Sequence, residues 1–426
     1  MMKTRLYSLF LLPMLTTSIW LMGQNDTLPP ELVEATQHMN KLTSDEFAGR
    51  GYTKNGHEKA AAYIASQFEA RGLIPMNGES YLQKFYIEIN LPEAASLTVN
   101  GKPLVIGKDF IVNKFSGSGQ IDGKIIDMGY GLHPSVKVEG KIVVIRDGWP
   151  TKIANDSEKQ AQYQNLKRMP QRIGAMLPYQ PLAIVILQKK LTAGFTREQA
   201  QIPILEVNLS AWPRCARKGS LSVVSNPKRI LSQNVVGYIP GTAENDTAVI
   251  ISAHYDHLGQ VGTAIFAGAN DNASGVSMML TMFKPMKYRT IFIAFGGEET
   301  GLIGSRFYVE KNPLFPLAQT KFILNLDLMG NGDEGIVAVG GAENKTFFEE
   351  LKRINEILKA VPIVRARSNA PNSDHFFFLE RGIPGFFVYT LGGPPHYHDV
   401  NDTAANLRFS RFTEVRELLM TFLSHI

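Results

Sequence analysis

The sequence predicts an α/β protein: a three-layer α/β/α domain around a mainly parallel mixed sheet, with a β-rich module inserted into it. From residue 234 onward, apolar runs of strand length recur between helix-like stretches. Several of these runs do not alternate with polar residues, as expected of strands that are buried on both faces. Between about residues 100 and 230 the pattern changes to short β-type runs separated by Gly, Pro and polar stretches, which indicates a separate module.

Length and composition allow a large folded protein. The chain has 426 residues, enough for more than one domain at roughly 100–200 residues each. Hydrophobic residues make up 44% and charged residues 19%, so a sizeable core is available. The formal net charge is +5 without a dense Lys/Arg run, and we therefore expect no nucleic-acid partner. The single cysteine, Cys215, cannot form an internal disulfide, and we predict a structural role for it.

Residues 1–23 have the build of a secretory signal peptide. Two basic residues precede an apolar stretch from Leu6 to about Gly23, and a polar chain follows. We expect cleavage near Gly23 or Gln24. An uncleaved anchor is the alternative because no A-x-A site is present, although the stretch is short for a membrane span. The mature protein is therefore predicted to be secreted or periplasmic, with no stable membrane association once the signal is cleaved.

Helical periodicity marks several segments of the layered domain. Glu58 to Arg71 carries apolar residues at helical spacing, and Gly72 is suited to end that helix. Ser274 to Met286 and Thr346 to Leu358 are also helix-like, and so is the C-terminal stretch RFTEVRELLMTFLSHI. Ser274 to Met286 and Thr346 to Leu358 lie between apolar runs of strand length, as in α/β folds.

These patterns divide the chain into three parts. We predict a signal peptide at 1–23, a discontinuous layered domain of 24–105 and 233–426, and an inserted module of 106–232. The strand-like runs within the module are KIVVIRDG (141–148), LAIVILQ (182–188) and IPILEVN (202–208).

Potential metal ligands stand at or near the ends of the buried runs. In open α/β sheets, ligands bind in the crevice beyond the carboxyl ends of the strands. Taken singly, HYDH is more often structural, and GANDNASG and Asp327 are explained equally well by turns or helix caps. Taken together, two histidines and three carboxylates supply the imidazole and oxygen ligands that suit zinc. The candidate ligands at these positions are His254, Asp256, His257, Asp271, Glu298, Glu299, Asp327, His398, Asp399 and Asp402.

Residues 295–301, FGGEETG, place two glutamates side by side just after a buried run. Adjacent side chains on an extended chain point to opposite faces. A solvated turn is the ordinary explanation, because Gly and charged residues commonly follow an apolar run. The alternative is a division of labour, in which one glutamate binds a metal and the other handles a proton.

The motifs and their order resemble the co-catalytic zinc aminopeptidases, a family that includes secreted bacterial leucyl aminopeptidases and glutamate carboxypeptidase II. The likeness spans about residues 40–100 and 234 to the end. The middle module, with GKIVVIRDG and IPILEVN, resembles the protease-associated (PA) domain that is often inserted in these enzymes. The motifs that carry the main resemblance are LTSDEFAGR, NVVGYIPG, HYDH, GANDNASG, GGEETG, NLDLMG, SDHFFFLERGIPGFF and HYHDVNDT.

The resemblance implies two zinc ions per chain. Asp271 would bridge them, His254 and Asp327 would complete the shell of one ion, and Glu299 with His398 that of the other. It also implies a cis peptide bond directly after Asp271.

The resemblance further assigns a role to four residues around the metals. Glu298 would act as general base, taking a proton from the attacking water and delivering it to the leaving amine. Tyr397 would donate to the oxyanion of the intermediate, with a packed aromatic ring as its alternative. Asp256 would hydrogen-bond the imidazole of His254, and Asp402 would help in a similar way.

The function implied is that of an exported zinc exopeptidase, chiefly an aminopeptidase, acting on peptide substrates. Two alternatives use the same fold: a single-zinc enzyme like glutaminyl cyclase, and a non-catalytic binding protein, as the transferrin receptor resembles this family without its activity. The complete ligand set and Glu298 argue against both. No motif indicates the preferred side chain, distinguishes aminopeptidase from carboxypeptidase or dipeptidase, or reports the oligomeric state.

Overall fold

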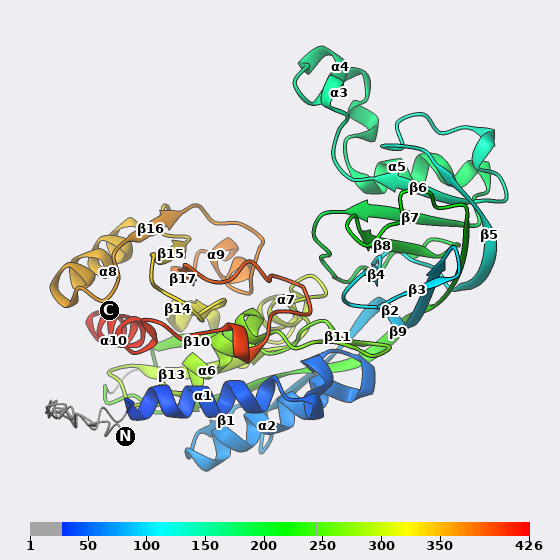
Figure 1. Ribbon diagram of the computed structural model, residues 1–426. Helices are drawn as coiled ribbons and strands as arrows, with labels where there is room; N and C mark the ends of the chain where they lie inside the picture. Colours follow the sequence, from blue (N-terminus) through cyan, green and yellow to red (C-terminus); the bar gives the residue numbers. More distant parts are fainter. Residues whose placement is uncertain (1–27, 244–245) are drawn as a thin grey trace, which may run out of the picture.

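The computed structural model describes residues 28–243 and 246–426, as an α/β body from which a lobe projects (Figure 1). The predicted signal peptide at residues 1–23 lies outside the described residues. Among the residues that are described, no helix is both long and apolar enough to cross a membrane.

Four parallel strands form the middle of the body's sheet, in the order β17-β14-β10-β13. Strands β15 and β9 flank them antiparallel, and β16 pairs parallel with β15 at the edge. The sheet is therefore mixed and mainly parallel, as predicted. The bounds are β9 (Lys218–Ile239), β10 (Ala248–His254), β13 (Arg289–Phe295), β14 (Thr320–Leu326), β15 (Gly335–Val339), β16 (Val364–Arg367) and β17 (Gly385–Leu391).

Helices cover both faces of this sheet, which confirms the three layers. Alternate residues of a strand face opposite sides, so Ile251 of β10 packs with one helical layer and Ile250 with the other. One layer contains α1 (Pro30–Leu42), α2 (Gly56–Ala70), α6 (Ser274–Leu280), α8 (Lys345–Leu358) and α10 (Phe412–His425). The opposite layer contains α7 (Ile303–Glu310) and α9 (Phe376–Glu380).

The helix expected from Ser274 to Met286 is shorter than predicted, because α6 ends at Leu280. The sequence contains the reason in Pro285, which cannot continue a helix and disfavours helical geometry at the residue before it. The Oγ1 of Thr281 also donates to the carbonyl of Met278, 2.8 Å away, at the helix end.

The lobe is joined to the body by a long antiparallel ribbon of β2 (Leu82–Val99) and β9, seen in cyan-blue and green in Figure 1. Strand β9 runs through the predicted boundary at 232/233 without a break, pairing with β13 at one end and with β5 at the other. The lobe also contains helices that we did not predict. The remaining lobe elements are β3 (Lys102–Leu104), β4 (Phe110–Val112), β5 (Gly119–Asp127), β6 (Ile142–Arg146), α3 (Thr151–Ala154), α4 (Ser157–Gln162), α5 (Met169–Met176), β7 (Ala183–Gln188) and β8 (Ile204–Asn208).

Three short strands complete the body. Strand β1 pairs with β9, and β11 and β12 form a hairpin in the chain after β10. Their bounds are β1 (Ile74–Pro75), β11 (Gly259–Val261) and β12 (Ala264–Phe266). Because the hairpin is inserted between β10 and α6, it places a long loop directly beside the carboxyl edge of the sheet.

Arg50 connects the backbone segments on either side of the hairpin at this edge of the sheet. Its guanidinium is fully buried and donates to the carbonyls of Tyr255, Ala267 and Gly268 at 2.8, 2.6 and 2.7 Å. Tyr255 directly follows β10, and Gly268 leads into the turn before α6. Burial lowers the pKa of Arg50 to about 10, so the side chain remains charged at neutral pH. One buried cation thus fixes two loops of the sheet edge.

Replacing Arg50 by Met should destabilise the protein by about 3 kcal/mol, because several buried carbonyl groups would lose their donors. Thermal unfolding of both proteins measures the difference. The matched control is Arg306→Met, which removes an exposed pair with Glu310 and a ring contact with Phe377 and should cost at most about 1 kcal/mol. Equal melting temperatures for the Arg50 variant and the unmodified protein would contradict this role.

Candidate metal centre

Most of the predicted site residues lie at or after the carboxyl ends of the parallel strands, at one edge of the sheet. His254 is the last residue of β10, and Glu298 and Glu299 follow β13 within four residues. Asp327 directly follows β14, and His398 lies in the loop after β17. Because parallel strands end at the same edge, residues far apart in the sequence converge there.

Asp271 comes from the turn that precedes α6 and lies between two imidazoles. Its Oδ1 is 3.2 Å from Nε2 of His254, and its Oδ2 is 3.1 Å from Nε2 of His398. Asp327 Oδ1 lies 3.4 Å from the same nitrogen of His254, and Glu299 Oε2 lies 3.0 Å from that of His398. The structure thus brings the five predicted ligands together as two groups that share Asp271. Their assignment as ligands stays a prediction. The expected cis peptide bond after Asp271 is present.

Grouping by distance alone gives a different pair of triads, each with its potential ligand atoms within 4.8 Å. These triads include Glu298 with His254 and Asp327, and His257 with Asp271 and Glu299. We retain the arrangement that shares Asp271, because each of its oxygens faces a different histidine. The Nδ1 of His257 already lies 2.6 Å from Glu299 Oε1, so a hydrogen bond from His257 orients that carboxylate.

The chemistry of the site fits a pair of zinc ions. Asp327 Oδ1 is buried without any hydrogen-bond partner, although it lies close to an imidazole nitrogen. A carboxylate oxygen is normally paired when buried, so this atom is suited to accept a cation. Imidazole nitrogens and carboxylate oxygens in this number are the donors that zinc takes. The residues present can therefore hold the expected metal.

The two neighbouring glutamates have opposite electrostatic environments. Burial, together with the charge of Glu299 and other carboxylates, raises the pKa of Glu298 well above its usual value. Glu299 is equally removed from water, but His398 and His257 outweigh that effect and lower its pKa to about 2. The pKa values of the two neighbouring carboxyl groups are therefore shifted in opposite directions. Such a divergence is typical of acid–base sites.

Asp256 supports the site, but not through the contact we predicted. Its Oδ1 lies 4.0 Å from Nδ1 of His254, beyond hydrogen-bond range. The backbone carbonyl of Asp256 lies 3.1 Å from that nitrogen and accepts its hydrogen bond instead. The Asp256 carboxylate instead accepts hydrogen bonds from the Tyr52 hydroxyl at 2.7 Å and from the backbone N–H of Glu298 at 3.1 Å. Asp256 therefore positions the glutamate loop through its side chain and His254 through its backbone.

Asp402 fixes the backbone that carries Asp271. Its two carboxylate oxygens accept from the N–H groups of Asn270 and Asp271, at 2.8 and 2.9 Å. Asp402 therefore supports Asp271 through its backbone, whereas we had predicted that it would hydrogen-bond an imidazole as proposed for Asp256.

Ser373 orients Asp327, and the sequence analysis missed it. Its hydroxyl donates to Asp327 Oδ2 at 2.9 Å and accepts from the Asn325 amide at 2.8 Å, with Ser252 bonded to Asn325 in turn. The only signal was the position of Ser373 inside the motif SDHFFF. His257 was noticeable in HYDH, but the sequence does not reveal its contact with Glu299.

Tyr397 lies against the predicted ligand His398. Its ring stacks on that of His398 with centroids 3.8 Å apart, and 51% of the residue is exposed. Burial of its hydroxyl and the charge of Asp271 raise its pKa, so the phenol keeps its proton. It also lines the cavity above the predicted ligands. Both predicted possibilities, hydrogen-bond donor and packed aromatic ring, are compatible with this placement.

The lobe touches the site directly. The carbonyl of Ala193 lies 3.0 Å from Nδ1 of His398 and accepts its hydrogen bond, while the Ala193 N–H donates to the His398 carbonyl at 3.1 Å. Phe195 meets Tyr52 edge-on at 5.6 Å, and Tyr52 holds Asp256. A segment of the lobe therefore fixes the orientation of a predicted metal ligand.

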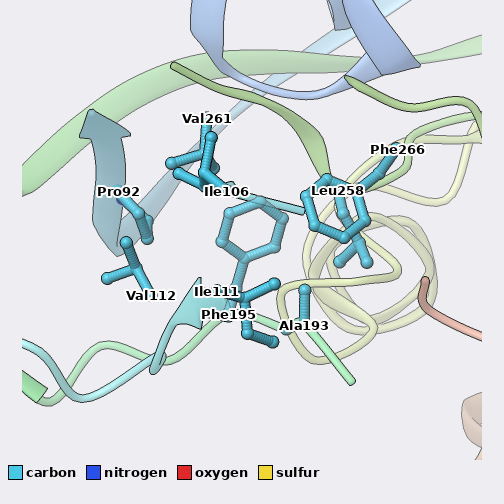
Figure 2. Close-up of a pocket in the computed structure, with 10 residues that line it drawn as sticks. Pro92, Ile106, Ile111, Val112, Ala193, Phe195, Leu258, Val261 and Phe266 are labelled. Carbon is cyan, nitrogen blue, oxygen red and sulfur yellow. The ribbon is translucent and has the colours of Figure 1, made fainter. Parts of the chain in front are cut away.

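The segment of the lobe that contains Ala193 and Phe195 packs against the body through apolar side chains. Figure 2 shows its side chains converging from the lobe and from the hairpin region after β10. The space they leave measures about 20 Å³, close to the size of a single water, and such an apolar space stays dry. It is a packing interface rather than a ligand site. The side chains drawn there include Ile106, Ile111, Phe195, Leu258, Val261 and Phe266.

Comparison with known proteins yields a family match. Residues 234–423, which carry all five predicted ligands, match the profile of peptidase family M28. This part of the chain is therefore similar to peptidase family M28. The predicted enzyme class, a metallopeptidase and hydrolase, is thereby confirmed. The predicted resemblance to zinc aminopeptidases is confirmed as well, whereas the PA-like nature of the lobe stays a prediction.

Individual relatives agree with this match. A probable leucine aminopeptidase of Arthroderma otae is 30% identical over 215 residues, which is 45% of this chain and 56% of that protein. The chain thus spans only about half of that relative's length. Aminopeptidase YwaD of Bacillus subtilis is 24% identical over 395 residues, covering 85% of this chain and 78% of its own.

The fold is shared with a solved structure, BSAP, a zinc aminopeptidase from Bacillus subtilis. The TM-score is 0.69 at 20% identity, and the match covers 94% of this chain and 96% of that one. Because the match extends over nearly the whole of both chains, body and lobe have counterparts in that fold.

Ser373→Ala should weaken zinc retention about 10- to 100-fold, because Asp327 loses the hydrogen bond that orients it. Dialysis against a graded chelator series, followed by metal analysis, measures the change. Ser277→Ala is the matched control, since this buried serine bonds only the carbonyl of Ala273 within its own helix. Unchanged retention in the Ser373 variant would remove that residue from the metal centre.

Proposed function

We propose that this chain is an exported, zinc-dependent exopeptidase that acts as an aminopeptidase on peptides. The observation that carries the proposal is the position of Asp271 between His254 and His398, with Glu298 lining the cavity above them. Two zinc ions per chain are the cofactor that the M28 match and the two groups of ligand atoms support. Export rests on the signal-like sequence of residues 1–23.

In the proposed mechanism, His254 and Asp327 would hold one zinc ion, Glu299 and His398 would hold the other, and Asp271 would contribute to both. When bound, the pair supplies Lewis acidity that makes water a nucleophile at neutral pH and polarises the scissile carbonyl. Glu298 takes the proton of the attacking water and delivers it to the leaving amine. Its backbone N–H is fixed by Asp256, so its carboxylate is held at the cavity.

Tyr397 lines the same cavity as the proposed base. Its proton-bearing hydroxyl donates a hydrogen bond to the oxygen that becomes negative as the carbonyl is attacked. Stacking on His398 holds the ring at the cavity wall, which limits the reorganisation needed during the reaction.

Two alternatives are disfavoured by the same arrangement. A single-zinc enzyme such as a cyclase has no need for a second histidine and carboxylate around Asp271. A non-catalytic binding protein has no need for a base at the cavity. The proximity of His398 and Glu299 and the position of Glu298 both support a hydrolase.

Glu298→Gln should abolish turnover while both zinc ions remain bound. The amide keeps the size of the side chain but cannot accept a proton, so we expect at least a 100-fold loss in kcat. Hydrolysis of aminoacyl anilides and metal analysis of the same sample measure the two quantities. Glu310→Gln, on the outer surface of α7, is the matched control and should leave activity unchanged. Substantial activity in the Glu298 variant would rule it out as the base.

Glu299→Ala and His398→Ala should each lower zinc content, because either change removes a ligand from one shell. The expected outcome is a fall from two ions per chain toward one after dialysis against a mild chelator. The Glu298→Gln protein, prepared in parallel, should keep two. If both alanine variants retained the full complement, the ligand assignment would be wrong.

A further inference from the structure

The cavity above the predicted ligands has two chemically different sides. Its volume is about 210 Å³. One side consists of the acidic groups of the metal centre, and the other contains a cation with apolar and amide neighbours. The lining residues on that second side are Leu328, Arg367, Asn372, Phe387 and Tyr389.

Arg367 is the feature of this wall that the mechanism does not use. It is the last residue of β16, next to β15 in register with Val339, and it is exposed. Its Nη1 donates to the hydroxyl of Tyr389 at 3.0 Å, which holds the guanidinium at the cavity. No salt bridge of Arg367 occurs among the residues described, whereas Arg71, Arg146 and Arg353 each pair with a carboxylate.

We propose that Arg367 forms a subsite for a carboxylate group of the substrate. This inference rests on the proposed peptidase function, because it assigns a substrate class to the same cavity. A guanidinium remains charged at every accessible pH and can bind a carboxylate through two parallel hydrogen bonds. Tyr389 fixes one nitrogen, so the outer donors remain free for the substrate. Leu328 and Phe387 provide an apolar surface for the methylene groups that precede such a carboxylate.

The positive charge of Arg367 also disfavours peptides with a basic first residue. In the metal-loaded enzyme, zinc compensates the carboxylates of the floor, and Arg367 then dominates the outer part of the cavity. A peptide with Lys or Arg at its first residue would bring a second positive charge close to this guanidinium. Specificity would therefore come from attraction and repulsion together.

Two parts of a peptide can supply the carboxylate. One is the side chain of an N-terminal Glu or Asp. The other is the C-terminal carboxylate of a dipeptide, which would make the enzyme a dipeptidase. Peptides with matched ends distinguish these sources, because an amidated C-terminus removes the second carboxylate and leaves the first.

The test uses the full zinc-loaded protein and its Arg367→Gln variant, with Arg365→Gln as matched control. Arg365 lies on the same strand and is exposed, but it does not line the cavity. The substrates are Glu-Leu-amide, Gln-Leu-amide, Lys-Leu-amide, Leu-Leu-amide and Leu-Leu. Binding of the same five peptides to the Glu298→Gln protein, with and without Arg367→Gln, is followed by calorimetry.

We expect about a tenfold advantage in kcat/KM and in affinity for one carboxylate-bearing member over its neutral partner. A preference for Glu-Leu-amide over Gln-Leu-amide indicates that Arg367 binds the side-chain carboxylate. A preference for Leu-Leu over Leu-Leu-amide indicates that it binds the C-terminal carboxylate. Arg367→Gln should remove the advantage mainly through KM, and Arg365→Gln should keep it.

Hydrolysis of all peptides without any such advantage, or an advantage that survives Arg367→Gln, overturns the subsite but leaves the peptidase function intact. No hydrolysis, with an Arg367-dependent binding preference, overturns the peptidase function and supports the subsite.

Discussion

The site depends on the crowding of three carboxylates against two histidines at one buried edge of the sheet. Asp271 lies within 3.2 Å of both imidazoles, and Glu299 and Asp327 approach the same two nitrogens. Taking so many ionisable groups out of water is costly unless charges of opposite sign compensate them. Bound cations supply that compensation, which links the acidic composition of this edge to metal binding.

Much of the surrounding structure holds these groups in place. Arg50 fixes the loops on either side of the hairpin, Asp402 fixes the backbone of Asp271, and Ser373 fixes Asp327. The lobe contributes the carbonyl of Ala193, which orients His398. Body and lobe are therefore joined in one functional unit, although the sequence pattern treats them as separate modules. This contact gives a physical reason for the presence of the lobe.

The sequence predicted the body well because its signals are local and strong. Unbroken apolar runs predicted the parallel strands, and the ends of those runs contained four of the five predicted ligands and Glu298. Asp271 came from the stretch before a predicted helix, and the resemblance assigned the roles. The helix at Thr346 to Leu358 agrees with α8 within one residue, since its apolar face has a clear helical period. The same reasoning overextended α6, where Pro285 was the overlooked signal.

The parts that sequence reasoning missed depend on contacts between distant residues. Periodicity does not show that the carbonyl rather than the carboxylate of Asp256 meets His254, nor that Ser373 reaches Asp327. Strand β9 crosses the expected boundary at 232/233, because its pairing with β2 continues on both sides of that position. Arg367 belongs to no motif, and only the folded chain places it in the cavity.

The most direct test of the central claim is a crystal structure of the purified protein with anomalous data collected at the zinc absorption edge. The account predicts two peaks, both in contact with Asp271, one beside His254 and Asp327 and the other beside Glu299 and His398. A single peak, or a carboxylate of Glu298 coordinated to metal in place of Glu299, would contradict it.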